Sequence, residues 1–329
     1  MEAGKLPPEL LSRLVLSRVG PRRDEVVVRA GLGEDAAALD LGGDLVVLSS
    51  DPITGAKEGA AGLAVDVACN DIGAMGAEPV GVLVTALYPS GTEGDAIARV
   101  TDEIEAAAAR LGVEVIGGHT EITSLVTAPI LVLTAVGRVP REGLRRSATA
   151  APGDALILTK SAGLEGTAIL ATDFAHLLGE LPRALVEEGR GFAGALSSVR
   201  DGVVAARNGA SALHDVTEGG VLGACLELAA ASGCGVRVYR SRVPVHPATE
   251  RICRHLGLDP LRLISSGAML VAAPDPERVL EALREAGIAA AKIGEVVSGE
   301  SVLVEPDGRE TPLAGPVVDE LWRFLAGAP

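Results

Sequence analysis

The sequence predicts an α+β protein of two domains, each built around a mixed sheet. Its 329 residues are enough for about two ordinary domains. Strand-like and helix-like segments occur in both halves without strict alternation, which favours α+β domains over a doubly wound parallel sheet. A polar, turn-rich stretch at 141–153 divides the chain, so we expect one domain at 1–150 and another at 151–329.

The first half begins with an expected short helix at 9–18. Strands are predicted where β-branched residues run between glycines, and helices where apolar residues recur every three to four positions. We expect strand 26–30 to pair with 44–50, and strand 113–116 to pair with 130–139. The remaining predicted elements are a strand at 80–87 and helices at 57–75 and 93–111.

The second half is predicted in the same way and ends in a strand pair at 290–297 and 301–305. The other strands are expected at 155–159, 236–239 and 268–272, and the helices at 165–178, 183–208, 217–231, 246–256 and 276–286.

Composition argues against several classes of protein. The net charge is −15 and 2% of the residues are aromatic, whereas a nucleic-acid binder needs a basic face and stacking aromatics. No apolar run reaches the roughly 18 residues of a membrane span, and the N-terminus lacks a signal-peptide pattern. We therefore expect a cytoplasmic protein with no nucleic-acid or membrane partner, whose cysteines are reduced and buried.

Four acidic, glycine-rich segments at the ends of apolar runs point to a phosphate and metal site. A single Asp at a strand end is more often part of a turn or a helix cap than a metal ligand. The evidence for a site is that four such segments occur in order along the chain. Carboxylates from several elements can converge on Mg²⁺, which shares oxygen ligands with substrate phosphates. The segments are Gly31–Asp35, Ser50–Pro52, Asn70–Gly76 and Gly117–Glu121.

Polar residues within these segments are the candidate ligands. Asp51 ends an apolar strand, and Asp35 follows glycines that let the backbone fold over an anion. Asn70 and Asp71 interrupt an apolar helix, where polar groups are costly unless they are paired. Either they are hydrogen-bonded within the structure or they face a site, and we favour the site.

Other candidates have a plain structural alternative. His119 and Glu121 follow two glycines, although a lone His is more often structural than catalytic. The segment His214–Gly220 opens a helix, whose N-terminus suits a phosphate, although Thr217 could be an ordinary N-cap. Lys57 and Lys160 could neutralise phosphate, but surface lysines are the commoner case.

The ordered motifs resemble the superfamily of aminoimidazole ribonucleotide (AIR) synthetase, thiamine-monophosphate kinase, selenophosphate synthetase and the hydrogenase expression/formation protein HypE. This resemblance implies an N-terminal domain that dimerises through its sheet, a C-terminal domain packed on it, and ATP and Mg²⁺ in the cleft. The motifs that carry it are Gly33-Glu-Asp-Ala-Ala37, Ser50-Asp51, Asn70–Ala77, Gly117-Gly-His-Thr120, His214–Gly220 and Ile293–Val296.

The resemblance also implies roles for individual residues, by position in the motifs. The metal would be held by Asp35, Asp51, Asp71 and Glu121. Nucleotide would contact Gly33, Asp35, Asn70, Thr217, Gly219 and Gly220, the last two through backbone N–H groups. His119, His214 and Asp215 are the candidates for acid–base or positioning roles.

The His214–Gly220 segment is similar to the His-Asp-Pro-Thr-Arg-Gly-Gly of HypE, which favours HypE-like proteins over the kinase. Two departures stand out: His119 occupies a position that is often acidic in the family, and the last cysteine of this chain is Cys253. HypE carries its carbamoyl group on a terminal cysteine. We therefore expect that this protein does not perform HypE's carrier chemistry.

The expected function is Mg²⁺- and ATP-dependent phosphoryl transfer to an amide or carbonyl oxygen of a small molecule, by a homodimer. Strands 80–87 and 130–139 are more apolar than half-solvated strands need to be, which also indicates a covering second copy. One alternative is a small-molecule kinase. The other is a hydrogenase-maturation scaffold that binds nucleotide and a partner protein without turnover.

Overall fold

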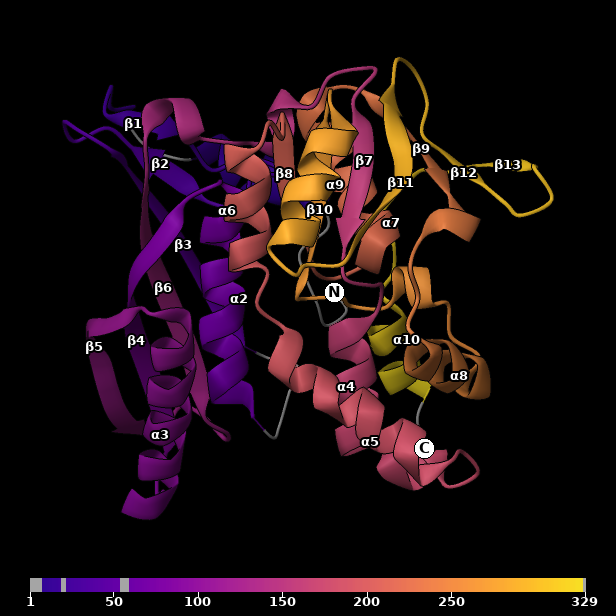
Figure 1. Cartoon of the computed structure of the whole chain (residues 1–329). Coiled ribbons are helices and arrows are strands. Elements are labelled where there is room, and N and C mark those ends of the chain that lie inside the picture. The colour runs from indigo at the N-terminus through magenta and orange to yellow at the C-terminus, as the bar shows by residue number, and fades with distance from the viewer. Residues whose placement is uncertain (1–7, 19–21, 54–58, 328–329) are drawn as a thin grey trace.

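The computed structural model describes residues 8–18, 22–53 and 59–327 and confirms two domains of helices and mixed sheets (Figure 1). The N-terminal domain contains a six-stranded sheet in the order β1-β2-β3-β6-β4-β5. Its β4 and β5 are parallel, and the other neighbours are antiparallel. The strands are β1 (Val26–Val28), β2 (Ala37–Leu39), β3 (Leu45–Ile53), β4 (Glu78–Pro89), β5 (Glu114–Thr123) and β6 (Ile130–Val139).

Two helices, α2 (Ala60–Ala74) and α3 (Gly94–Leu111), pack on one face of this sheet, as Figure 1 shows. A short α1 (Pro8–Leu14) precedes the sheet. The core between helices and strands is built from small and branched apolar side chains, with Leu45, Ile72 and Leu133 fully buried. This matches a sequence that is rich in Ala, Val and Leu and poor in aromatics.

The predicted strand pairs of the first half are wrong. The chain inserts β2 between β1 and β3, and β6 lies between β3 and β4 rather than beside β5. The predicted strand 113–116 also continues to Thr123, so the Gly117–Glu121 motif lies inside a strand and not after one. Gly117 and Gly118 have φ of +151° and +144°, and a Cβ on Gly118 would lie 1.9 Å from the Val84 carbonyl oxygen, so this part of the strand requires glycine.

The C-terminal domain contains a seven-stranded sheet in the order β13-β12-β9-β11-β7-β10-β8, in which β9 and β12 are parallel and the other pairs antiparallel. Its strands are β7 (Ala155–Thr159), β8 (Ala212–Val216), β9 (Gly235–Tyr239), β10 (Ala268–Ala273), β11 (Ala290–Val297), β12 (Val302–Val304) and β13 (Glu310–Pro312). Its helices are α4 (Leu164–Asp173), α5 (Arg183–Gly191), α6 (Val199–Arg207), α7 (Gly220–Ser232), α8 (Pro247–Leu256), α9 (Pro276–Glu285) and α10 (Glu320–Gly327).

Short 3₁₀ turns connect many of these elements. They lie at Leu16–Arg18, Arg141–Gly143, Ser147–Thr149, Ala175–Leu178, Phe192–Ala195, Arg240–Arg242 and Pro260–Arg262.

Two expectations for the second half are wrong, and one strand was missed. The single helix expected at 183–208 is broken into α5, a 3₁₀ turn and α6. The final strands β11 and β12 do not pair with each other, because β9 lies between them. The edge strand β8, which carries His214 and Asp215, was not predicted.

The two domains meet where α2 packs against α6 and β8 (Figure 1). A Cβ built on Gly73 of α2 would lie 2.7 Å from the Cα of Val199, and one on Gly202 of α6 would lie 2.2 Å from the Gly73 carbonyl oxygen. Real Cβ atoms do not approach so closely, so glycine at both positions is what lets these helices touch. This contact places the polar residues of α2 at the junction between the domains.

Candidate functional site

Four aspartates from three elements and one loop approach one another where the domains meet. Asp71 on α2 is 9% exposed, and the Ser49 hydroxyl of β3 contacts its carboxylate. The same hydroxyl lies 3.1 Å from Oδ2 of Asp51. We call Asp35, Asp51, Asp71 and Asp215 the acidic junction, since the charges of the other three all act on Asp71.

The electrostatics of the acidic junction favour a cation. Burial raises the pKa of Asp71 well above its ordinary range, and the charges of Asp215, Asp51 and Asp35 raise it further. Repulsion among carboxylates falls when a divalent ion binds between them. Carboxylate oxygens are also the ligands that Mg²⁺ takes in proteins. The donor set therefore fits this ion.

His214 links the two domains through a buried charged contact. Its Nδ1 lies 2.8 Å from Oδ1 of Asp35, and its Nε2 lies 2.9 Å from Oε2 of Glu227 on α7. The Ser147 hydroxyl is 3.0 Å from Nδ1. Burial alone would lower the pKa of His214, but the carboxylates of Asp35 and Glu227 raise it well above its ordinary value. The imidazolium is therefore held on both sides, which suits positioning more than free proton transfer.

The contact with His214 uses one oxygen of Asp35. The other, Oδ2, is buried and has no hydrogen-bond partner within the described part of the chain. An orphaned buried carboxylate oxygen is costly unless a cation or donor satisfies it. The glycine two residues earlier, Gly33, lies against α7, with φ of +73°.

Asn70 joins the domains rather than facing the acidic junction. Its Nδ2 donates to the Leu196 carbonyl at 2.8 Å, and its Oδ1 accepts from the Ser198 N–H at 2.6 Å. The residue is fully buried. Of the two alternatives for this position, the geometry supports the structural one.

The glycines at the start of α7 have partners for both N–H groups that were predicted to hold phosphate. Gly219 donates to Oδ2 of Asp319 at 2.6 Å, and Gly220 donates to the Thr217 carbonyl at 3.1 Å. A Cβ on Gly220 would lie 2.7 Å from the Leu263 carbonyl oxygen. In this structure the glycine N–H groups are therefore not available to phosphate, and close packing is what requires Gly220.

Asp319 was not singled out from the sequence. It is 3% exposed, and burial raises its pKa to about 6 despite the backbone N–H groups that it accepts from Leu321 and Gly219. Its carboxylate occupies the N-terminus of α7, the position that the sequence assigned to phosphate. No local sequence pattern indicates this contact, because Asp319 and Gly219 are 100 residues apart.

His119 and Glu121 lie on β5, at the far edge of the N-terminal sheet. They pair with each other at 3.2 Å, and their side chains are 64% and 52% exposed. Two strands, β6 and β4, separate β5 from β3, so they stand roughly 14 Å from the strand of Asp51. Within one chain the structure does not bring them to the acidic junction.

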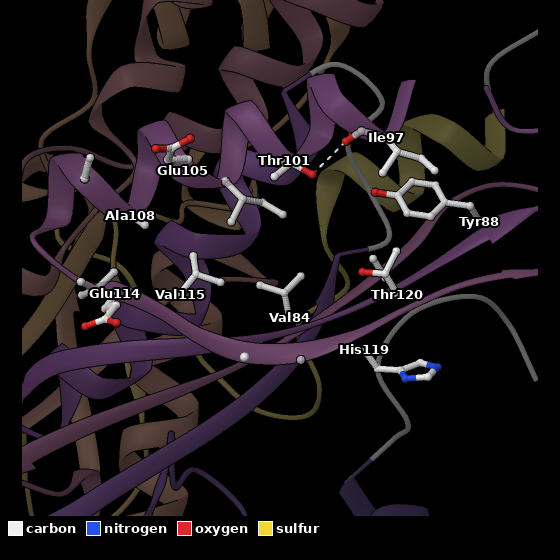
Figure 2. A pocket seen from close by; sticks show the side chains of 16 residues that line it. Val84, Tyr88, Ile97, Thr101, Glu105, Ala108, Glu114, Val115, His119 and Thr120 are labelled. Carbon is white, nitrogen blue, oxygen red and sulfur yellow. Dashed lines mark hydrogen bonds between the residues drawn. The ribbon is translucent and has the colours of Figure 1, made fainter. Parts of the chain in front are cut away.

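A pocket of about 660 Å³ lies between α3 and the β4–β5 edge. Figure 2 shows Val84, Val115 and Ile97 around it, with His119 pointing away. The backbone of Gly117 and Gly118 lines the same space. This mostly apolar lining, with Glu105 and Glu114 beside it, does not suit a phosphate group.

Of the two lysines that could neutralise phosphate, Lys57 lies outside the described residues. Lys160 is neither a surface lysine nor free for phosphate, because its ammonium donates to the Ser197 and Gly267 carbonyls, both at 2.6 Å, and pairs with Asp201.

Among the described residues, no three His, Cys, Asp or Glu side chains are arranged to hold a metal ion by themselves. Three cysteines are buried, and burial raises the pKa of Cys69, Cys225 and Cys253 to about 12. None of the helices described here is both long and apolar enough to span a membrane.

Comparison with known proteins gives the family. The model of the AIR synthase related protein, N-terminal domain, matches residues 33–139, and that of the C-terminal domain matches residues 151–305. Carbamoyl dehydratase HypE of Azotobacter vinelandii is 33% identical over 267 residues, which cover 77% of this chain and 73% of that protein. A putative hydrogenase expression/formation protein of Methanocaldococcus jannaschii is 27% identical, over 86% of this chain and 84% of its own length.

Solved structures agree with this grouping. Escherichia coli HypE superposes with a TM-score of 0.71 at 27% identity, covering 88% of this chain and 93% of that one. Thiamine monophosphate kinase from Aquifex aeolicus is 17% identical, over 84% of this chain and 92% of its own, and shares the fold with a TM-score of 0.68. The chain therefore belongs to the AIR synthase related protein family and, within it, is similar to HypE.

Proposed function

We propose that this protein is an Mg²⁺- and ATP-dependent enzyme that phosphorylates an amide or carbonyl oxygen of a small molecule, so that the oxygen can leave as phosphate. The observation that carries this is the acidic junction between the domains. The relatives confirm the class of enzyme, because HypE proteins are carbamoyl dehydratases and one HypE structure is a complex with ATP. In phosphoryl transfer, positioning and electrostatic stabilisation supply most of the catalysis.

Mg²⁺ would be held by Asp51, Asp71 and the unpartnered Oδ2 of Asp35. When bound, it would neutralise charge on the phosphates of the nucleotide. Mg²⁺ is usually bound through one or two carboxylates plus substrate phosphates, which accords with the described residues offering no complete metal cage. His214 would hold Asp35 in place through its 2.8 Å contact. Glu121 and His119 would take part only if a second copy delivered them.

The proposed assembly is a homodimer formed by the N-terminal sheet. Apolar side chains of β4, β5 and β6 are exposed at 38–50%, as large interfaces between subunits require. The helices α2 and α3 pack on one face, so the other is left for a second copy. On this free face the exposed residues include Leu83, Ile116 and Ile130, whereas Val115 lines the pocket under α3.

Two other functions stay as candidates. A small-molecule kinase would use the same acidic junction with a hydroxyl or phosphate acceptor. A maturation scaffold would bind nucleotide and a partner protein, as the name of the M. jannaschii relative suggests. The proposed location is the cytoplasm, where ATP is supplied.

The decisive experiment is ADP release with defined acceptors. Formylglycinamidine ribonucleotide, thiamine monophosphate and a carbamoylated peptide are added separately to protein, ATP and Mg²⁺. An acceptor with an amide or carbonyl oxygen should stimulate ATP hydrolysis, and Asp71→Asn should abolish the stimulation. Stimulation by thiamine monophosphate alone would favour the kinase, and ATP binding without turnover for any acceptor would favour the scaffold.

A further inference from the structure

A second, smaller pocket of about 220 Å³ lies between the domains, and the acidic junction does not account for it. One wall is the first half of α2, with Leu63 and Asp66, and the opposite wall is α4, with Glu165 and Ile169. Drug-sized ligands occupy pockets of roughly 300–1,000 Å³, so this one would take one end of a small molecule. Leu196 lines it as well.

The lining of this pocket contains more carboxylates than cationic side chains. Asp66 is neutralised by Arg110, which contacts both its oxygens at 3.0 Å. Glu165 is 6% exposed, and within the described part of the chain it has no cationic partner of this kind and its Oε2 has no hydrogen-bond partner. Asp173 is a further carboxylate of the lining. A buried, unbalanced carboxylate beside a pocket is complementary to a cation or to a strong N–H donor.

Two interactions connect the residues of this pocket with those of the proposed active site. The carbonyl of Leu196 accepts the hydrogen bond from Asn70, which precedes Asp71 in α2. The charges of Asp319 and Glu218 act on Glu165 in the pocket wall, and Glu218 belongs to the His214–Gly220 segment. A molecule held here would therefore lie beside the segments that form the acidic junction.

We propose that this pocket binds the cationic or N–H-rich end of the acceptor, an amidinium, guanidinium or ammonium group on a small apolar body, with Glu165 as its counter-ion. This assignment rests on the proposed phosphoryl-transfer function. Leu63, Ala168 and Ile169 contact the apolar part, and the carboxylate of Glu165 receives the N–H group.

The protonation of Glu165 provides a signature for this contact. The pKa of Glu165 is raised to about 7, mainly by burial and also by the charges of Asp319 and Glu218, although hydrogen bonds from Ser266 lower it. Among the described residues that line the pocket, Asp66, Arg110 and Asp173 are the other charged groups. A cation binds the ionised carboxylate, so a proton competes below pH 7. Between pH 8 and pH 6 the affinity should fall about tenfold, and binding at pH 6 should release a proton.

The test uses benzamidine and its neutral isostere benzamide as probes of the full-length protein, by calorimetry without nucleotide. Benzamidine should bind and benzamide should not. Glu165→Gln should weaken benzamidine at least tenfold, because Gln can keep the Ser266 contacts but carries no charge. Glu277→Gln, on the exposed first turn of α9, is the matched control and should change nothing.

Equal binding of the two probes, or unchanged benzamidine affinity in Glu165→Gln, would overturn the assignment. Binding of inorganic phosphate in competition with benzamidine would overturn it as well, since an anion would then be the ligand. If Glu165→Gln fails to fold, the assignment is tested on the parent protein instead, by the ratio of its affinities for benzamidine and benzamide and by the pH dependence of that ratio. Asp71→Asn should retain benzamidine binding while losing Mg²⁺-dependent ATP binding, which separates this proposal from the proposed function.

Discussion

Asn70 offers a sharp test of how the two domains are held together. Its side chain is fully buried and makes two hydrogen bonds, 2.8 Å to the Leu196 carbonyl and 2.6 Å from the Ser198 N–H. Replacing it by alanine leaves a buried acceptor and a buried donor without partners. Each orphaned group costs about 1–3 kcal/mol, so Asn70→Ala should destabilise the protein by roughly 2–6 kcal/mol. That is a large part of the roughly 5–15 kcal/mol that ordinary proteins have.

The matched control is Asn208→Ala. Asn208 also donates from Nδ2 at 2.8 Å, but to the Val204 carbonyl four residues earlier and at a half-buried helix end. Loss of this local bond should cost about 1 kcal/mol. The difference between the two variants isolates the contribution of the contact between domains.

Because the two domains need not unfold together, urea denaturation is combined with amide hydrogen exchange. The Ser198 amide should exchange at least tenfold faster in Asn70→Ala, while amides in the centre of the C-terminal sheet keep their protection. A variant that stays within 1 kcal/mol of the parent, with the Ser198 amide still protected, would refute the structural role. If it instead lost ATP affinity alone, Asn70 would be a site residue.

Three further predictions use the same structure. Asp71→Asn should weaken ATP binding in Mg²⁺ more than without metal, because a ligand charge is lost; calorimetry that finds equal affinities in both conditions would contradict the metal assignment. Light scattering should give about twice 33.3 kDa for the parent and 33.3 kDa for Leu83→Glu, which places a charge on the apolar sheet; a parent that is monomeric at micromolar concentration would contradict the dimer. After incubation with carbamoyl phosphate, ATP and the carbamoyltransferase partner, intact-mass measurement should show no adduct on the protein. The thiolate is the reactive form of cysteine, and burial raises the pKa of three of the thiols to about 12. A carbamoyl or cyano adduct would restore the carrier role. The residues at issue are Cys69, Cys225, Cys234 and Cys253.

The sequence by itself determined the fold class, most of the elements and the members of the acidic junction. The strand 130–139 and the helices α8 and α9 follow from local apolar periodicity and from caps, which depend on neighbouring residues. Asp35, Asp51 and Asp71 could be selected because each interrupts or ends an apolar run. The resemblance to the family rests on the same short motifs.

Tertiary structure decided which strands pair and what each polar group contacts. The helix expected at 183–208 breaks at 192–198, because its backbone groups are taken by distant side chains: Lys160 binds the Ser197 carbonyl, and Asn70 binds the Leu196 carbonyl and the Ser198 N–H. Those partners lie 37 to 128 residues away, so no local pattern reports them.

The start of α7 shows the same limit at the site itself. Glycines before a helix suggested a phosphate cradle, but Asp319, 100 residues on, occupies the N–H of Gly219. His119 and Glu121 likewise share a motif with the family yet lie at a sheet edge far from Asp51, because strand order is fixed by long-range packing. Local propensity selects elements and candidate ligands, while contacts between distant segments select which of those ligands can meet.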